Sequence, residues 1–197
     1  MSKTIGIVLF DDAEELDWAG PWEVFTATAS AFPGDRVVTI AQESRPIRCA
    51  KGLRVLPDHS FADAPRLDVV LVPGGIGTLR EVDNPVMLSW LREAAKPCQW
   101  VTSVCTGAHV LWAAGLARGK RVTTHWTFVE TLREKTDATV LENTRYVRDG
   151  NVVTSAGVSA GIDMALWLVG QMYSVETARL IQKGIEYNPA PPYAAEV

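Results

Sequence analysis

The chain has 197 residues, of which 47% are hydrophobic and 21% charged, and its formal net charge is −4 at pH 7. This composition is typical of a globular protein that buries a core without disulfides or a structural metal. The acidic balance argues against a nucleic-acid partner, which favours a basic face. The first apolar run stops at Asp11 and Asp12, so it is too short for a signal peptide or a membrane span.

The elements follow from short β-branched runs that alternate with helical patterns along the whole chain. We expect strands at 5–10, 36–41, 68–72, 99–104, 120–124, 139–140, 145–148 and 152–154, with a piece of hairpin at 53–56. We expect helices at 21–32, 85–95, 106–114, 128–134, 159–173 and 175–187. Asn84 and Ser174 are expected to cap two of these helices, and Asp149-Gly150-Asn151 to join a hairpin.

This alternation predicts an α/β fold, in which a mostly parallel sheet carries helices on both faces. We expect a single-domain, flavodoxin-like three-layer sandwich with a nucleophile elbow, spanning residues 1–188 and followed by a proline-rich tail at 189–197. Ligands of such folds bind beyond the carboxyl ends of the strands. Here those places follow Phe10, Val72 and Val104.

The third of these places carries a cysteine. Cys105 stands between Ser103 and Gly107, and small residues two positions either side are typical of a nucleophile on a sharp strand-to-helix turn. The start of a helix also favours the thiolate. The alternative is an ordinary buried thiol, which is common in protein cores, and we interpret Cys49 and Cys98 in that way.

The second place carries glycines. The sequence Pro73-Gly74-Gly75 ends a strand, and its backbone N–H groups would point into the crevice as half of an oxyanion hole, with the N–H of Thr106 as the other half. This requires strands 68–72 and 99–104 to be neighbours. A plain tight turn is the alternative.

The first place carries a carboxyl group. Asp17 lies in an apolar stretch before the helix expected to start at Pro21, where partial desolvation would raise its pKa and suit it to acid–base work. A helix cap or dipole partner is the alternative. An apolar substrate would need an apolar pocket, for which Trp18, Trp22 and Trp126 are candidate walls; core packing is the alternative and applies to at least one of them.

The histidines do not provide an obvious partner for the thiol. His125 follows a strand and is a candidate catalytic base, but a packed structural role is favoured beside Trp126. His109 lies one turn after Cys105 and is expected to face the packing. The three histidines do not cluster with the cysteines at ligand spacing, so we expect no metal and no other cofactor. An odd cysteine number without CxxC favours a reducing, cytoplasmic location.

Several stretches resemble the ThiJ/PfpI superfamily, whose fold is similar to that of class I glutamine amidotransferases. They are VPGG at 72–75, VTSVCTGAHVLWAAGLARGKRVTTHW at 101–126 and VTSAGVSAGIDMAL at 153–166. LDWAGPWEV at 16–24 and EYNPAPP at 186–192 are similar to the isonitrile (isocyanide) hydratase subgroup.

The resemblance implies a lyase that converts an isonitrile and water to an N-substituted formamide through a cysteine-bound thioimidate. It implies that Cys105 is the nucleophile, that Asp17 is the carboxyl group near its sulfur, and that Thr106 replaces a histidine of the protease-like branch. Gly74 and Gly75 would position substrate or water, with Trp18, Trp126 and His125 around the substrate. It also implies a homodimer that binds a small molecule.

Two other functions are compatible with the same resemblance. A very similar domain forms the N-terminal half of AraC-type regulators, so a non-catalytic ligand- or redox-sensing domain is one alternative. A glyoxalase-type cysteine enzyme is the other, although the combination of Asp17 and Thr106 speaks against it.

Overall fold

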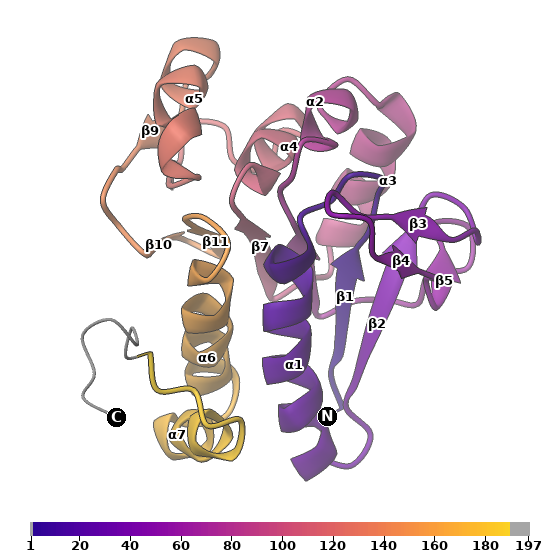
Figure 1. Ribbon diagram of the computed structural model, residues 1–197, viewed down its shortest axis with the longest axis vertical. Coiled ribbons are helices and arrows are strands. Elements are labelled where there is room, and N and C mark those ends of the chain that lie inside the picture. Colours follow the sequence, from indigo (N-terminus) through magenta and orange to yellow (C-terminus); the bar gives the residue numbers. More distant parts are fainter. Residues whose placement is uncertain (1, 190–197) are drawn as a thin grey trace.

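The central sheet has seven strands, and Figure 1 shows its helices arranged around it. The computed structural model describes residues 2–189, so most of the expected tail at 189–197 lies outside the described residues. The strand order is β10-β11-β7-β6-β1-β2-β5, and all neighbours pair in parallel except the hairpin of β10 and β11. The strands are β1 (Thr4–Val8), β2 (Arg36–Ala41), β5 (His59–Ser60), β6 (Val69–Val72), β7 (Trp100–Val104), β10 (Tyr146–Asp149) and β11 (Val152–Ser155).

Helices cover both faces of the sheet, which confirms the α/β sandwich. One layer holds α1 (Glu15–Ala31), α6 (Ala160–Met172) and α7 (Val175–Gly184), where α1 and α7 each pack against α6. The other layer includes α3 (Pro85–Ala95) and α4 (Gly107–Ala113), which contact β6. The remaining elements are α2 (Thr78–Glu81), η1 (Trp126–Phe128), α5 (Val129–Lys135) and the short strand pairs β3 (Ile47–Arg48) with β4 (Arg54–Val55) and β8 (Arg121–Val122) with β9 (Thr139–Val140).

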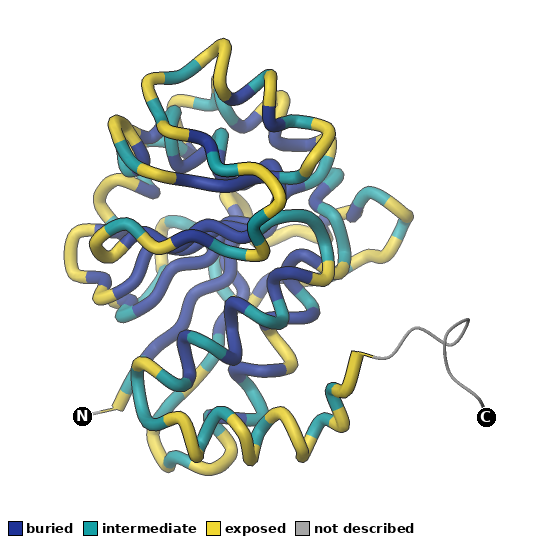
Figure 2. The backbone as a smooth tube through the Cα atoms, turned by 90° about the vertical axis from the view of Figure 1, so that its left-hand side faces the viewer, coloured by how far each residue is buried: buried dark blue, intermediate teal, exposed yellow. Residues whose placement is uncertain are grey.

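The core lies along the central strands. Every residue of β1, β6, β7 and β11 is buried, as expected for strands covered on both faces. Figure 2 shows this buried backbone running through the middle of the molecule, with exposed segments at its periphery. Between residues 2 and 189, no helix combines the length and apolar character needed to cross a membrane.

The first helix differs from the prediction. It begins at Glu15, and Pro21, which we expected at its first position, lies inside it. Packing against α6 explains how the helix continues through the proline. A Cβ on Gly20 would lie 2.8 Å from Cγ1 of Ile162, and a Cβ on Gly161 would lie 3.1 Å from Cγ of Pro21. Asp17 therefore lies in the first turn of α1 rather than before it.

Both predicted helix caps are confirmed. Oδ1 of Asn84 accepts hydrogen bonds from the N–H groups of Val86 (3.1 Å) and Met87 (3.3 Å), and Oγ of Ser174 accepts one from Thr177 (3.1 Å). These side chains satisfy backbone donors that the first turn of a helix leaves free.

We expect Gly107→Ala to lower the free energy of unfolding by roughly 3 kcal/mol, because a Cβ there would lie 2.2 Å from the carbonyl oxygen of Val72 and must displace a buried strand. Gly184→Ala is the matched control, since nothing lies within 4 Å of its Cβ position. It should be neutral or stabilise by up to about 1 kcal/mol. Urea denaturation measures both, and equal effects of the two variants would contradict this packing.

Candidate active site

Cys105 lies on a sharp turn between β7 and α4. Its φ is 56°, a left-handed conformation that residues other than glycine rarely adopt and that neighbouring contacts must hold in place. The Cys105 N–H lies 3.1 Å from the carbonyl oxygens of both Ser155 and Ala156, and the Cys105 carbonyl accepts a hydrogen bond of 2.9 Å from Oγ1 of Thr124. The backbone at the cysteine is thus fixed from two other segments.

The Pro-Gly-Gly loop rests directly on this turn. β6 and β7 are parallel neighbours, as the predicted site requires. A Cβ on Gly74 would lie 2.6 Å from the Thr106 nitrogen and 2.7 Å from Cβ of Cys105, so only glycine allows this approach. A Cβ on Gly75 would lie 2.4 Å from the carbonyl oxygen of Asp12. The φ of Gly75 is +117°, a value that residues other than glycine rarely adopt.

The structure does not show the predicted half of an oxyanion hole at Gly74 and Gly75, because the N–H groups of both residues already donate to acceptors within the protein. The Gly74 N–H donates to Oδ2 of Asp17 at 2.8 Å, and the Gly75 N–H donates to Oγ1 of Thr106 at 3.0 Å. The prediction that these groups point unpaired into the crevice was wrong. The loop uses them to fix the carboxyl group and the threonine instead.

Asp17 is fully buried beside the thiol, with an exposed fraction of 0%. Burial raises its pKa to about 7, although the hydrogen bond from Gly74 and an interaction with the Cys105 side chain oppose this shift. Oδ1 is buried and has no hydrogen-bond partner among residues 2–189. The carboxyl group therefore has one oxygen fixed by the backbone and one available to the sulfur or a bound molecule.

The thiol itself is protonated at neutral pH when Asp17 is ionised. Burial, followed by the charge of Asp17, raises the pKa of Cys105 to about 12, against hydrogen bonds from Thr106 that lower it. We expected the start of the helix to favour a thiolate, and burial outweighs that effect. Together the two side chains titrate as a coupled pair.

Thr106 ties the loop to the turn. Its Oγ1 accepts a hydrogen bond from Oγ1 of Thr78 (3.0 Å) in addition to that from Gly75, and donates to the Gly75 carbonyl oxygen (3.2 Å). Both threonines are buried. Thr78 lies in the glycine-rich stretch of 71–78, but the sequence pattern of that stretch did not predict the contact between Thr78 and Thr106.

Trp18, Trp126 and His125 lie in different environments. Trp18 is 7% exposed and belongs to the core, whereas Trp126 is 79% exposed on the surface. His125 bonds through Nδ1 to Oγ1 of Thr127 at 2.7 Å, and its ring packs on Gly157. The difference in exposure disfavours a shared apolar wall formed by the two tryptophans of one chain. A role of His125 at the thiol stays a prediction.

An apolar cavity that the sequence did not predict lies beside Thr106. Its volume is about 320 Å³, and His109 forms part of its wall. Burial lowers the pKa of His109 to about 4, so the ring is neutral at pH 7. The other lining residues are Thr78, Leu79, Val82, Asp83, Trp112, Ala113, Phe128, Thr131, Lys135 and Thr136.

Comparisons with known proteins agree with this architecture. An isonitrile hydratase from Pseudomonas putida is 40% identical over 193 residues, which cover 98% of this chain and 82% of that protein. The HTH-type transcriptional regulator GbdR from Pseudomonas aeruginosa is 30% identical over 189 residues, and the chain spans 51% of its length. The crystal structure of a ThiJ/PfpI family protein from Pseudomonas syringae superposes with a TM-score of 0.90 at 31% identity, covering 100% of this chain and 80% of that one.

The family model described as the DJ-1/PfpI family matches residues 3–171, which include α1, the Pro-Gly-Gly loop and the cysteine turn. The chain therefore belongs to the DJ-1/PfpI family.

Proposed function

We propose that this chain hydrates an isonitrile to an N-substituted formamide, with Cys105 as the nucleophile and Asp17 as the proton donor. The observation that carries the proposal is the fully buried Asp17 carboxyl group, which accepts a hydrogen bond from Gly74 on the loop that lies directly against Cys105, itself held at positive φ. The similarity to an isonitrile hydratase over nearly the whole chain supports the substrate class.

The proposed reaction proceeds in two stages. The sulfur of Cys105 bonds to the terminal carbon of R–N≡C, and the proton from Asp17 is transferred to that same carbon, which gives the thioimidate R–N=CH–S–Cys105. Water then adds to the carbon while the ionised Asp17 accepts one of its protons and the nitrogen gains the other hydrogen. Breaking of the C–S bond releases R–NH–CHO and returns the thiol and carboxyl pair to its starting protonation.

The reactive form is the pair that holds a single proton. With two protons the sulfur is a weak thiol nucleophile, and with none there is no acid to protonate the carbon. The raised pKa values of Asp17, about 7, and Cys105, about 12, leave the singly protonated pair populated across this interval. Transfer of that proton from sulfur to carboxylate generates thiolate and acid together.

The apolar cavity beside Thr106 is our candidate for the R group of the isonitrile. Leu79, Trp112 and Phe128 form the apolar part of its wall, and Thr106, the residue after the proposed nucleophile, also lines it. A ligand pocket of this kind is mostly apolar with a few fixed polar groups. Thr106 acts as a positioning residue in this proposal, since its hydroxyl holds the loop that fixes Asp17.

A ligand-sensing role is the second candidate, favoured by the similarity to half of a transcriptional regulator. A wild-type chain that binds but does not turn over isonitriles would support it. The homodimer and the cytoplasmic location stay predictions.

Cys105→Ala should lower formamide production from a simple alkyl or aryl isonitrile by about a thousandfold or more, because the covalent step is lost. Chromatographic measurement of the formamide follows the reaction. Cys98→Ala is the matched control, since that thiol is also buried but bonds to the carbonyl oxygens of Ala94 and Leu67. Full activity of Cys105→Ala would exclude the nucleophile, and an inactive wild type would exclude the assignment.

Asp17 should give a pH dependence whose sign follows from its raised pKa. Loss of the first proton creates the reactive pair, so wild-type kcat/KM should rise with pH through about 7 and then level off. Asp17→Asn should abolish this inflection and retain little activity, whereas Glu23→Gln on the exposed side of the same helix should preserve it. Rates that fall with rising pH near 7 would contradict the proposed pair.

The same carboxyl group should make stability depend on pH. Its folded pKa of about 7 lies above the unfolded value, so folding is favoured most below pH 4 and loses stability as pH rises from about 4 to 7. Relative to the wild type, Asp17→Asn should gain up to about 4 kcal/mol in free energy of unfolding between pH 4 and pH 8. Urea denaturation at both pH values tests this, and an equal difference at both would show that Asp17 titrates normally.

A further inference from the structure

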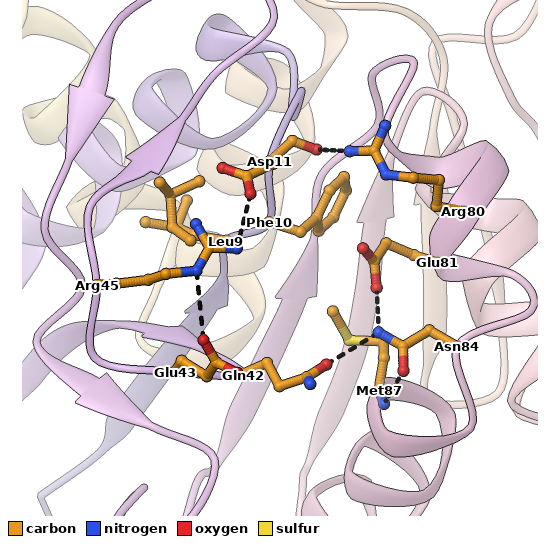
Figure 3. A pocket seen from close by; sticks show the side chains of 11 residues that line it. Leu9, Phe10, Asp11, Gln42, Glu43, Arg45, Arg80, Glu81, Asn84 and Met87 are labelled. Carbon is orange, nitrogen blue, oxygen red and sulfur yellow. Dashed lines mark hydrogen bonds and ion pairs between the residues drawn. The ribbon is translucent and has the colours of Figure 1, made fainter.

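A second cavity, which neither Cys105 nor Asp17 lines, lies where β1 and β2 end beside the start of α3. Its volume is about 210 Å³. Its apolar side is formed by the buried residues Leu9, Phe10, Ile47 and Met87. Polar side chains from the same three segments, at 11, 42–45 and 80–84, surround its remaining sides in Figure 3.

The arginines of this cavity are already neutralised. Arg45 contacts Oδ2 of Asp11 at 2.7 Å and Glu43 at 3.4 Å, and Arg80 contacts Asp12 at 3.0 Å. Both arginines are therefore paired with carboxylates of the protein, which disfavours an anion as the ligand of the cavity.

Glu81 is different, because it is a carboxylate without a cationic partner among the described residues. It is 9% exposed and lines the cavity. Oε2 accepts a hydrogen bond of 2.8 Å from Nδ2 of Asn84, while Oε1 accepts none from residues 2–189. A charge that is largely desolvated and unpaired favours binding of a positive group.

Asn84 holds two acceptors in place. Its Nδ2 donates to Oε2 of Glu81 and also to Oε1 of Gln42 at 3.0 Å, while its Oδ1 is used by the cap of α3. Figure 3 shows Gln42 and Glu81 reaching Asn84 from opposite sides. Both the nitrogen and the oxygen of the Asn84 side-chain amide are engaged in hydrogen bonds. Asn84 therefore holds the Glu81 carboxylate and the side-chain oxygen of Gln42 next to each other at the wall of the cavity.

We propose that this cavity binds a small primary alkylammonium compound, with the ammonium on Glu81 and Gln42 and the alkyl chain on Phe10 and Met87. An ammonium group offers three donors, which suits converging oxygen acceptors. A divalent metal ion would require more free oxygen ligands than one carboxylate oxygen and one amide oxygen. The apolar side favours an organic cation over a hydrated inorganic one.

The test is a titration of the full chain with n-butylammonium chloride at pH 7, followed by NMR of the Asn84 side-chain amide and the Met87 methyl group. Saturable shifts at both groups with a Kd of about 1 mM are expected for so small a ligand. 1-Butanol and butyrate should each bind at least tenfold more weakly. Equal binding of 1-butanol, tighter binding of butyrate, or the absence of saturable shifts would overturn the proposal without any variant.

Glu81→Gln provides the second arm, because it keeps the size of the side chain and removes the charge. It should weaken n-butylammonium binding at least tenfold. Glu43→Gln is the matched control, since it makes the same charge change at an exposed position paired with Arg45, and should alter Kd less than threefold. Unchanged binding by folded Glu81→Gln, or an equal loss in both variants, would contradict the assignment to Glu81.

Discussion

The hydrogen bond from the Gly74 N–H to Oδ2 of Asp17 connects the three segments on which the site depends. It joins the first turn of α1 to the loop after β6, and that loop lies against the cysteine turn so closely that no side chain fits at residue 74. Since the Gly74 N–H is used for this purpose, it does not serve as an oxyanion donor in the resting protein. Charge that develops in the proposed reaction is therefore met by the Asp17 proton, which the same bond positions.

Desolvation decides the electrostatics of the pair. A helix terminus contributes about 0.3–1 kcal/mol at most sites. Raising the pKa of Cys105 from 9.0 to about 12 corresponds to roughly 4 kcal/mol. Burial therefore outweighs the helix effect, and an isolated thiolate is disfavoured. The buried carboxyl group experiences the same penalty, so a single negative charge shared between the two side chains is the favourable arrangement near neutral pH.

The fold was largely predictable because its signals are local. β-Branched runs marked the buried strands, and Asn84 marked a helix start by its side-chain chemistry. The start of α1 was missed because packing against α6 stabilises a helix through Pro21, which no local pattern shows. Cys105 and Asp17 were proposed as site residues from their places after two strands. The engaged N–H groups of Gly74 and Gly75, the exposure of Trp126, and the contacts of Glu81 with Asn84 and Gln42 depend on tertiary structure, so the sequence did not predict them.

The central claim is that Asp17 and Cys105 share one proton. Carbon-13 NMR of the Asp17 carboxyl carbon and the Cys105 Cβ, recorded against pH in the same sample, tests it most directly. With a shared proton, both signals should shift with a common midpoint near pH 7, where the pKa of Asp17 lies. A carboxyl signal that titrates near pH 4, with the Cys105 signal unchanged up to pH 8, would contradict it.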